Sequence, residues 1–240
     1  MLSYLRHETK TFTKGVTDIK FRHECKHEIS ASDLISLRHR LNAVAMTDPH
    51  AENGKYEIRS LYFDNLYDKA LREKTDGVNC REKFRIRLYN RDCSLIKLEK
   101  KSKINGLCSK ESALLTAQEA ESIINRDTDW MASDDRPLVT ELYSKMKSQG
   151  LKPRTIVEYT REPFIFAAGN VRVTLDYDIR TGLDCRELLS DSCVTVPTGS
   201  AIILEVKWDE FLPSVIRDIV QLDGTRTGAF SKYAACRIYG

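Results

Sequence analysis

Alternating charged and apolar residues mark the stretch from residue 81 to residue 110, REKFRIRLYNRDCSLIKLEKKSKINGLCSK. Read at a period of two, it predicts two strands, each with one cationic face and one apolar face. The first strand places Arg81, Lys83, Arg85, Arg87 and Tyr89 opposite Phe84, Ile86 and Leu88. The second places Lys97, Glu99, Lys101 and Lys103 opposite Ile96 and Leu98. Because such close like charges repel, each row indicates a water-covered sheet face or a surface that binds an anion.

The same alternation recurs along the chain and predicts about eight strands in all. Besides the two cationic strands, the pattern predicts strands over residues 19–28, 56–64, 109–115, 154–162, 170–178 and 201–208. Asn105-Gly106 is a strong signal for a hairpin turn after the second cationic strand. Most of these segments have one charged and one apolar face, which favours a sheet that curls on itself.

Helical spacing and capping residues predict the other elements. Ser30 or Ser32 caps a helix, Thr116 caps another, and Pro137 and Gly150 bound a third. The predicted helices cover residues 33–46, 65–74, 117–125, 138–149 and 213–222. Residues 1–18 are polar and aperiodic, so we expect a flexible N-terminal arm followed by a single domain over residues 19–240.

These elements predict an α+β fold: an antiparallel eight-stranded β-barrel with helices packed outside and charged residues inside. A closed barrel of about eight strands has an interior just wide enough for side chains or one narrow ligand. Unpaired cations in such a space are costly, and a polyphosphate-like anion would relieve them. The interior carboxylates Glu24, Glu99 and Glu205 could pair with the cations, or could hold a divalent metal that bridges phosphates.

Composition narrows the possible partners. Of 240 residues, 30% are charged, yet the net charge is only +3, which argues against a broad nucleic-acid-binding surface. The first twenty residues lack an apolar signal core, and the longest apolar runs, such as residues 201–204, are too short to span a bilayer. The seven cysteines are scattered without a CxxC pair, which is typical of reduced thiols in a cytoplasmic protein. His23 and His27 lack the spacing of metal ligands.

Eight motifs, in order, carry a resemblance to a known family: RHECK at 22–26, IRSLYFD at 58–64, KTDGVNCREKFRIRLYN at 74–90, KLEKKSK at 97–103, YTREPF at 159–164, VRVTLD at 171–176, ILEVKW at 203–208 and FSKY at 230–233. They resemble the polyphosphate polymerase domain of the vacuolar transporter chaperone (VTC) family, within the CYTH or triphosphate-tunnel superfamily. The resemblance covers about residues 20–235 and is closest to the stand-alone bacterial members, without an SPX domain. It implies an antiparallel tunnel barrel.

The resemblance also implies a set of site residues. Five cations are implied in catalysis: Arg85, Arg87, Lys101, Arg161 and Lys232. Five residues are implied in substrate binding: Lys26, Lys110, Tyr159, Arg172 and Ser231. Glu205 is implied as the ligand of Mn²⁺ or Mg²⁺. These residues lie on the faces that the alternation had already marked as charged, or beside them.

The implied function is an ATP-dependent polyphosphate polymerase, which transfers the γ-phosphate of ATP to a growing chain. The expected partners are ATP and inorganic polyphosphate, with no nucleic acid, and a separate membrane protein could work beside it. One alternative is a metal-dependent triphosphatase of the same fold. Such relatives have an ExExK motif, whereas Arg22 replaces the first glutamate here, which favours the polymerase. The other alternative is a non-catalytic phosphate-binding module, because Ala229 stands where the catalytic pattern has a lysine.

Overall fold

The structure is a computed structural model that describes residues 22–105, 107–199, 201–222 and 230–239. Its centre is one antiparallel sheet, in which eight strands follow the order β1-β10-β8-β7-β3-β4-β5-β6 and two short strands, β2 and β9, pair with β7 and β8. The strands are β1 His23–Ile29, β2 Met46–Thr47, β3 Tyr56–Asp64, β4 Arg81–Tyr89, β5 Ile96–Ile104, β6 Leu107–Leu115, β7 Lys152–Phe166, β8 Val171–Gly182, β9 Thr195–Pro197 and β10 Ile202–Trp208.

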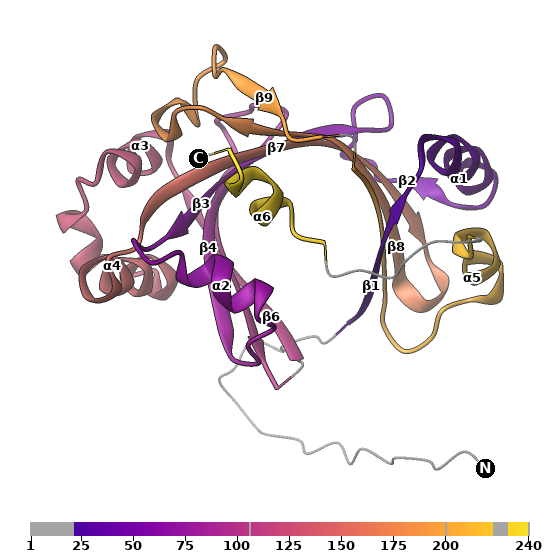
Figure 1. The fold of residues 1–240 in the computed structure, drawn as a ribbon, viewed down its shortest axis with the longest axis horizontal. Helices are drawn as coiled ribbons and strands as arrows, with labels where there is room; N and C mark the ends of the chain where they lie inside the picture. Colours follow the sequence, from indigo (N-terminus) through magenta and orange to yellow (C-terminus); the bar gives the residue numbers. More distant parts are fainter. Residues whose placement is uncertain (1–21, 106, 200, 223–229, 240) are drawn as a thin grey trace.

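Helices surround this sheet (Figure 1). They are α1 Ala31–Val44, α2 Lys69–Thr75, α3 Ala117–Asn125, α4 Pro137–Gln149, α5 Ser214–Val220 and α6 Lys232–Arg237, with 3₁₀ turns η1 Asp129–Ser133, η2 Ala168–Asn170 and η3 Cys185–Glu187. Ser30 and Thr116 cap α1 and α3 as predicted, each in a capping box. Pro137 begins α4, and Gly150 ends it with φ of 67°.

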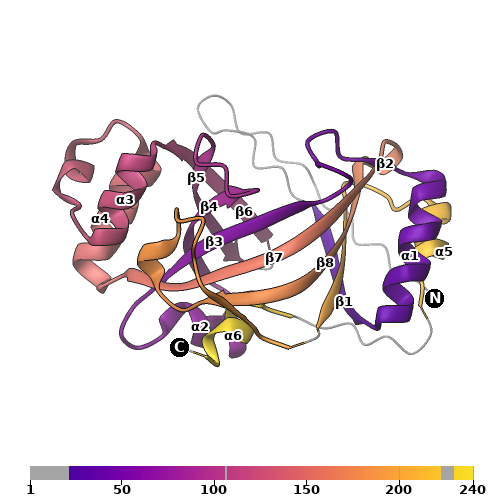
Figure 2. The same cartoon turned by 90° about the horizontal axis from the view of Figure 1, so that it is seen from above.

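The predicted fold class is confirmed: the sheet is antiparallel, follows eight strands and is curled, with helices around it (Figures 1 and 2). The predicted closure into a barrel is not seen, because no strand pairing in the described part of the chain joins β1 to β6. The sheet is a curled half-barrel. Across its opening, Lys101 Nζ of β5 lies 3.4 Å from Glu24 Oε2 of the edge strand β1, so a side-chain contact bridges the opening.

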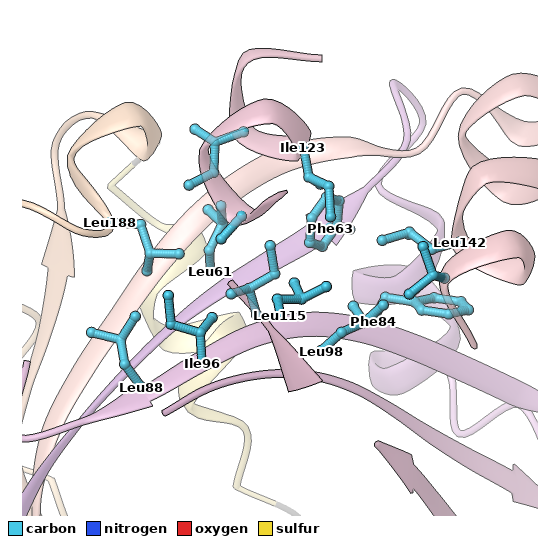
Figure 3. Close-up of a cluster of buried hydrophobic side chains, with 14 of the residues drawn as sticks. Leu61, Phe63, Phe84, Leu88, Ile96, Leu98, Leu115, Ile123, Leu142 and Leu188 are labelled. Atoms are coloured by element: carbon cyan, nitrogen blue, oxygen red, sulfur yellow. The ribbon is translucent and has the colours of Figure 1, made fainter. Parts of the chain in front are cut away.

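Two apolar clusters cover the outer face of the sheet. The larger lies between β3, β4, β5 and the helices α3 and α4, where Phe84, Ile86 and Leu88 of β4 are almost fully buried (Figure 3). The smaller joins β8 and β10 to α1 and α5 through residues such as Leu37 and Ile216. The apolar parity of each strand therefore faces the helices, as the alternation predicts, and the opposite parity faces the hollow of the half-barrel.

The sheet differs from the predicted strands in length and number. The strands β2 and β9 have two and three residues, too few to show an alternation. The strand β7 continues to Phe166, beyond residue 162, where the predicted strand ends. Along one side, β7 pairs with β3 as far as Arg161 and with β2 from Phe164 onward. Pro163 is tolerated because it lies in the gap between these two partners. The predicted N-terminal arm, residues 1–18, lies outside the described residues.

The concave face also has an apolar part, which holds the helix α6. Tyr56, Ile58, Tyr62, Val157, Tyr159, Ile179 and Ile203 form a buried cluster there with Tyr233 and Cys236 of α6. The rings of Tyr62 and Tyr233 stack with their centres 5.0 Å apart. Figure 1 shows α6 within the curl of the sheet, and Figure 2 shows it beside α2.

Candidate functional site

The cationic rows of β4 and β5 meet on the concave face. The register pairs Arg85 with Glu99, and the Arg85 guanidinium lies 2.7 Å from Glu99 Oε2. Arg87 Nη1 lies 3.8 Å from the same oxygen, and the Lys110 ammonium of β6 contacts the other one. One carboxylate is therefore shared by three cations. Burial alone would raise the pKa of Glu99, but Arg85 and Arg87 lower this pKa to about 2.

A second group of charges lies where β1 pairs with β10. Lys26 Nζ lies 2.9 Å from Glu24 Oε1 and 3.1 Å from Glu205 Oε1. Lys207 Nζ lies 3.5 Å and 3.4 Å from the same two carboxylates. Burial opposes ionisation of Glu205, but Lys26, Lys207 and Arg161 hold its pKa well below the ordinary value. The carboxylates Glu24 and Glu205 therefore remain charged within a cluster of lysines.

A third group joins β7, β8 and α6. Arg161 makes a two-pronged contact with Asp176, at 2.6 Å and 2.7 Å, and its Nη2 lies 3.5 Å from Glu205 Oε2. Lys232 Nζ, from α6, lies 2.6 Å from Asp176 Oδ2. Both cations also lie over the ring of Tyr159, with the Lys232 ammonium 4.7 Å from its centre. The helix α6 thus places a lysine in the hollow that the strands line.

The structure brings most of the predicted site residues into this hollow. Tyr159 accepts a hydrogen bond from Arg87 Nη2 at 3.4 Å, and Lys101 contacts Glu24. Arg172 lies further along the concave face, where it binds Asp48 at 3.1 Å and contacts the hydroxyl of Tyr56. The residues that meet through these contacts are Lys26, Arg85, Arg87, Lys101, Lys110, Tyr159, Arg161, Glu205 and Lys232.

Ser231 has a local structural role at the start of α6. Its side chain caps α6 by accepting a hydrogen bond from the backbone N–H of Ala234 at 3.3 Å. Its predicted contact with phosphate stays a prediction. Ala229, which replaces the lysine of the catalytic pattern, lies outside the described residues.

Four further residues belong to this hollow but were not among the predicted site residues: Tyr62, Lys83, Asp176 and Lys207. Three of them share the strand parity of a predicted neighbour, Lys83 with Arg85, Asp176 with Arg172 and Lys207 with Glu205, so the alternation could have found them. Tyr62 pairs with Arg85 in the register of β3 and β4, and no local pattern in β3 gives that register. Its hydroxyl accepts a hydrogen bond from Arg85 Nη1 at 2.8 Å.

Tyr62 and Lys83 have unusual acidities because they lie among cations. Burial alone would raise the pKa of Tyr62, but Arg85 and Lys83 lower it to about 7. Burial lowers the pKa of Lys83, and Arg85 and Lys101 lower it further, to about 8. Lys83 Nζ lies 5.6 Å from the centre of the Tyr62 ring, and no carboxylate of the described residues lies within ion-pair distance of it. Both groups therefore titrate near neutral pH.

Positive charge is in excess on this face. Among the described inner residues, the cations Lys26, Lys83, Arg85, Arg87, Lys101, Lys110, Arg161, Lys207 and Lys232 stand against the carboxylates Glu24, Glu99, Asp176 and Glu205. The carboxylates are each shared between several cations, so they cannot neutralise the whole set. The arrangement suits a ligand that carries several closely spaced negative charges.

The acidic groups offer a metal ion only part of a coordination shell. In the described residues no three histidine, cysteine or acidic side chains are grouped as metal ligands would be. Glu205 and its neighbour Glu24 supply carboxylate oxygens, and both accept contacts from Lys26. Mg²⁺ is commonly held by one or two carboxylates together with substrate phosphates and water. Glu205 therefore fits a metal that arrives with a phosphate ligand, and does not fit a metal held by the protein alone.

Comparison with known proteins identifies the family. The family model named VTC domain matches residues 21–238, so the chain belongs to the VTC domain family. This confirms the resemblance that the sequence motifs carry. A search of curated proteins finds no match.

Several solved structures are similar in outline. The PH1819 protein of Pyrococcus horikoshii OT3 is 14% identical, with a TM-score of 0.47 over 89% of this chain and 97% of that chain. The PH1012 protein of the same organism is 11% identical, with a TM-score of 0.47 over 88% and 96%. The Mimivirus capping enzyme triphosphatase is 11% identical, with a TM-score of 0.40 over 84% and 87%. The family assignment rests on the family-model match.

None of the helices in the part of the chain that the structure describes has the length and apolar character needed to cross a membrane.

Proposed function

We propose that this protein binds polyphosphate and ATP in the hollow of its half-barrel and acts as a polyphosphate polymerase. The observation that carries the proposal is the surplus of cations on one concave face, contributed by β1, β4, β5, β6, β7, β10 and α6. A chain of phosphates presents closely spaced anionic oxygens, which match both the two-pronged geometry of arginine and the point charge of lysine. Membership of the VTC domain family supports the same substrate class.

The chemistry we propose is direct transfer of a phosphoryl group between two phosphate chains. The terminal oxygen of the growing chain attacks the γ-phosphorus of ATP in line, a new P–O bond forms, and ADP leaves with the electrons of the broken bond. The attacking oxygen is already anionic, so no general base is required. Arg85, Arg87, Arg161 and Lys232 spread the negative charge that develops on the transferring group.

Several side chains of the hollow then have a binding role in this proposal. Lys26, Lys101 and Lys110 would hold the non-reacting phosphates, with Tyr159 as a polar neighbour. A divalent cation, Mg²⁺ or Mn²⁺, would be held by Glu205 and the phosphates and would neutralise bridging oxygens. A cytoplasmic location would supply ATP, and delivery of the product to a separate membrane protein is part of the same proposal.

The test is the identity of the products. The purified protein is incubated with ATP and Mn²⁺, and ADP, orthophosphate and long-chain polyphosphate are measured. ADP together with long chains supports the polymerase. Orthophosphate without chains would establish a triphosphatase instead, and tripolyphosphate binding without turnover would establish a binding module.

The variant Glu205→Gln sharpens this test. It keeps the shape of the side chain but removes a charge that would hold the metal, so we expect turnover to be abolished. Binding of tripolyphosphate without metal should persist, because the variant removes a negative charge from a cationic face. Glu158→Gln is the matched control, since Glu158 is a buried, ion-paired carboxylate on the outer face. Full turnover in Glu205→Gln would contradict the assignment.

A further inference from the structure

Two contacts outside the phosphate-facing hollow anchor the helix α6. At its C-terminal end, the guanidinium of Arg237 lies 2.7 Å from Asp68 Oδ1, beside the start of α2. In its first turn, the hydroxyl of Tyr233 donates to Asp64 Oδ2 at 2.7 Å. Both contacts lie where α6 lies beside α2 (Figure 2). They fix the position of the helix but do not orient the side chain of its first residue.

Asp176 orients the side chain of Lys232, the first residue of α6. The ammonium of Lys232 lies 2.6 Å from Asp176 Oδ2, while Arg161 holds both oxygens of the same carboxylate. Asp176 is 0% exposed and sits in β8, paired with Arg161 of β7 and Ile203 of β10. A carboxylate fixed between two strands thus sets the distance between a cation of the sheet and a cation of the helix.

The charge state of Asp176 suits this task. Burial disfavours its ionised form, but Arg161 and Lys232 hold its pKa below the ordinary value, so it stays charged near neutral pH. It belongs to no group of three or more metal-ligand side chains in the described residues, and both of its oxygens contact cations. Asp176 therefore holds those two cations in place. Its effect on a bound phosphate comes only through their positions.

We propose that Asp176 is a positioning residue, which holds Lys232 of α6 and Arg161 of β7 together in the arrangement that meets a phosphate chain. The proposal rests on the proposed function for its effect on turnover, but not for its effect on α6. Without this carboxylate, the positive charges of Lys232 and Arg161 repel each other, and the start of α6 moves away from the sheet. Lys232 would then no longer lie beside Arg161 at the transferring phosphate.

The experiment compares Asp176→Asn with wild type and with Glu158→Gln. Three quantities are measured: the dissociation constant for tripolyphosphate by calorimetry, kcat for ADP formation, and amide hydrogen exchange in residues 232–237 with and without tripolyphosphate. Glu158→Gln also loses a buried carboxylate of an ion pair, 2.6 Å from Arg59, but on the outer face. It therefore reports any general loss of stability.

For Asp176→Asn we expect turnover and the exchange of α6 to change while tripolyphosphate binding does not weaken. Tripolyphosphate should bind no more weakly than to wild type, because a negative charge has left a cationic face. Turnover should fall about tenfold or more, because a displaced cation no longer meets the transferring group. Exchange in α6 should become faster, and Asp176→Glu should restore part of the turnover. Glu158→Gln should leave kcat and α6 exchange unchanged.

Other outcomes overturn the proposal. Unchanged exchange in α6 would mean that Asp176 does not hold the helix. A parallel loss of binding and turnover would make Asp176 a general structural residue or a ligand contact. If wild type lacks polymerase activity, the exchange and binding measurements still decide whether Asp176 positions Lys232, so failure of the proposed function is recognised separately.

Discussion

Two arginines on adjacent strands show how the outer and inner faces of one sheet differ. On the outer face, Arg59 of β3 binds Glu158 of β7 at 2.6 Å and donates its other hydrogen bonds to the carbonyls of Leu188 and Ser190. On the inner face, Arg85 of β4 binds Glu99 of β5 at 2.7 Å, but Arg87 and Lys110 contact the same carboxylate.

The comparison distinguishes an ion pair that stabilises the fold from ion pairs that belong to a binding site. Arg59 is 1% exposed, and the protein alone satisfies its charge and most of its donors. The cations around Glu99 share one counter-charge and face the hollow. A buried pair on the outer face is therefore expected to matter for folding, whereas the inner set is expected to matter for binding an anion.

The largest expected effect comes from the inner face. Replacing Arg85 and Arg87 together by alanine should reduce turnover about a thousandfold or more, because two donors to the transferring group are lost. Tripolyphosphate binding, measured by calorimetry, should weaken strongly. Chemical unfolding should report a smaller loss of stability than that of an Arg59 variant, because Glu99 keeps Lys110 as a partner. Wild-type turnover in the double variant would show that these arginines do not line the reaction path.

The next effect comes from the outer face. Arg59→Met should lower the free energy of unfolding by about 3–5 kcal/mol, because it leaves the buried carboxylate of Glu158 with only the more distant Arg91, 3.7 Å away. Urea denaturation would measure this loss. Turnover per folded molecule should stay at the wild-type level. A stable variant with reduced tripolyphosphate binding would mean that the two faces are not separate in function.

The smallest expected effect is a pH dependence that has opposite signs for folding and binding. In the folded protein the pKa of Tyr62 is about 7 and that of Lys83 about 8, both below the ordinary values of 10.0 and 10.5. As the pH rises from 7 to 8, the folded state therefore releases protons that the unfolded chain keeps. Stability should rise by about 1 kcal/mol over this range.

Tripolyphosphate binding should weaken over the same range, since Lys83 loses positive charge and Tyr62 gains negative charge. Thermal unfolding and calorimetry at the two pH values test both signs. Tyr62→Phe and Lys83→Met should each flatten both profiles. A binding profile that stays level in wild type would contradict a role for this pair near the phosphate path.

The inner and outer faces were largely predictable because alternation is a local property. The residues opposite Phe84, Ile86 and Leu88 had to face away from the helices, whatever the register of the strands. Closure of the barrel was not predictable in this way. It depends on how far the sheet curls, and here Lys101 and Glu24 meet through their side chains without a pairing of their strands.

The predicted cations Arg85, Arg87 and Lys101 could be read from one segment of the sequence. The alternation places Asp176 on the charged face but does not show that it binds Lys232, because α6 is distant in sequence. Tyr62 meets Arg85 through the register of β3 and β4, which the sequence does not give. Asp176 contacts Lys232 across 56 positions, and no local pattern announces such a pair.

The sequence by itself determined which residues would lie on the charged side of each strand, because successive side chains of a strand point to opposite faces. It also determined the family, through motifs whose order spans the chain. Only the tertiary structure decided which charges share a partner, since that depends on register and on the placement of α6. The same arginine side chain is a structural element at position 59 and a candidate ligand-binding group at position 85. Glu158 and two backbone carbonyls bind the buried Arg59, whereas Arg85 shares Glu99 with two other cations that line the hollow.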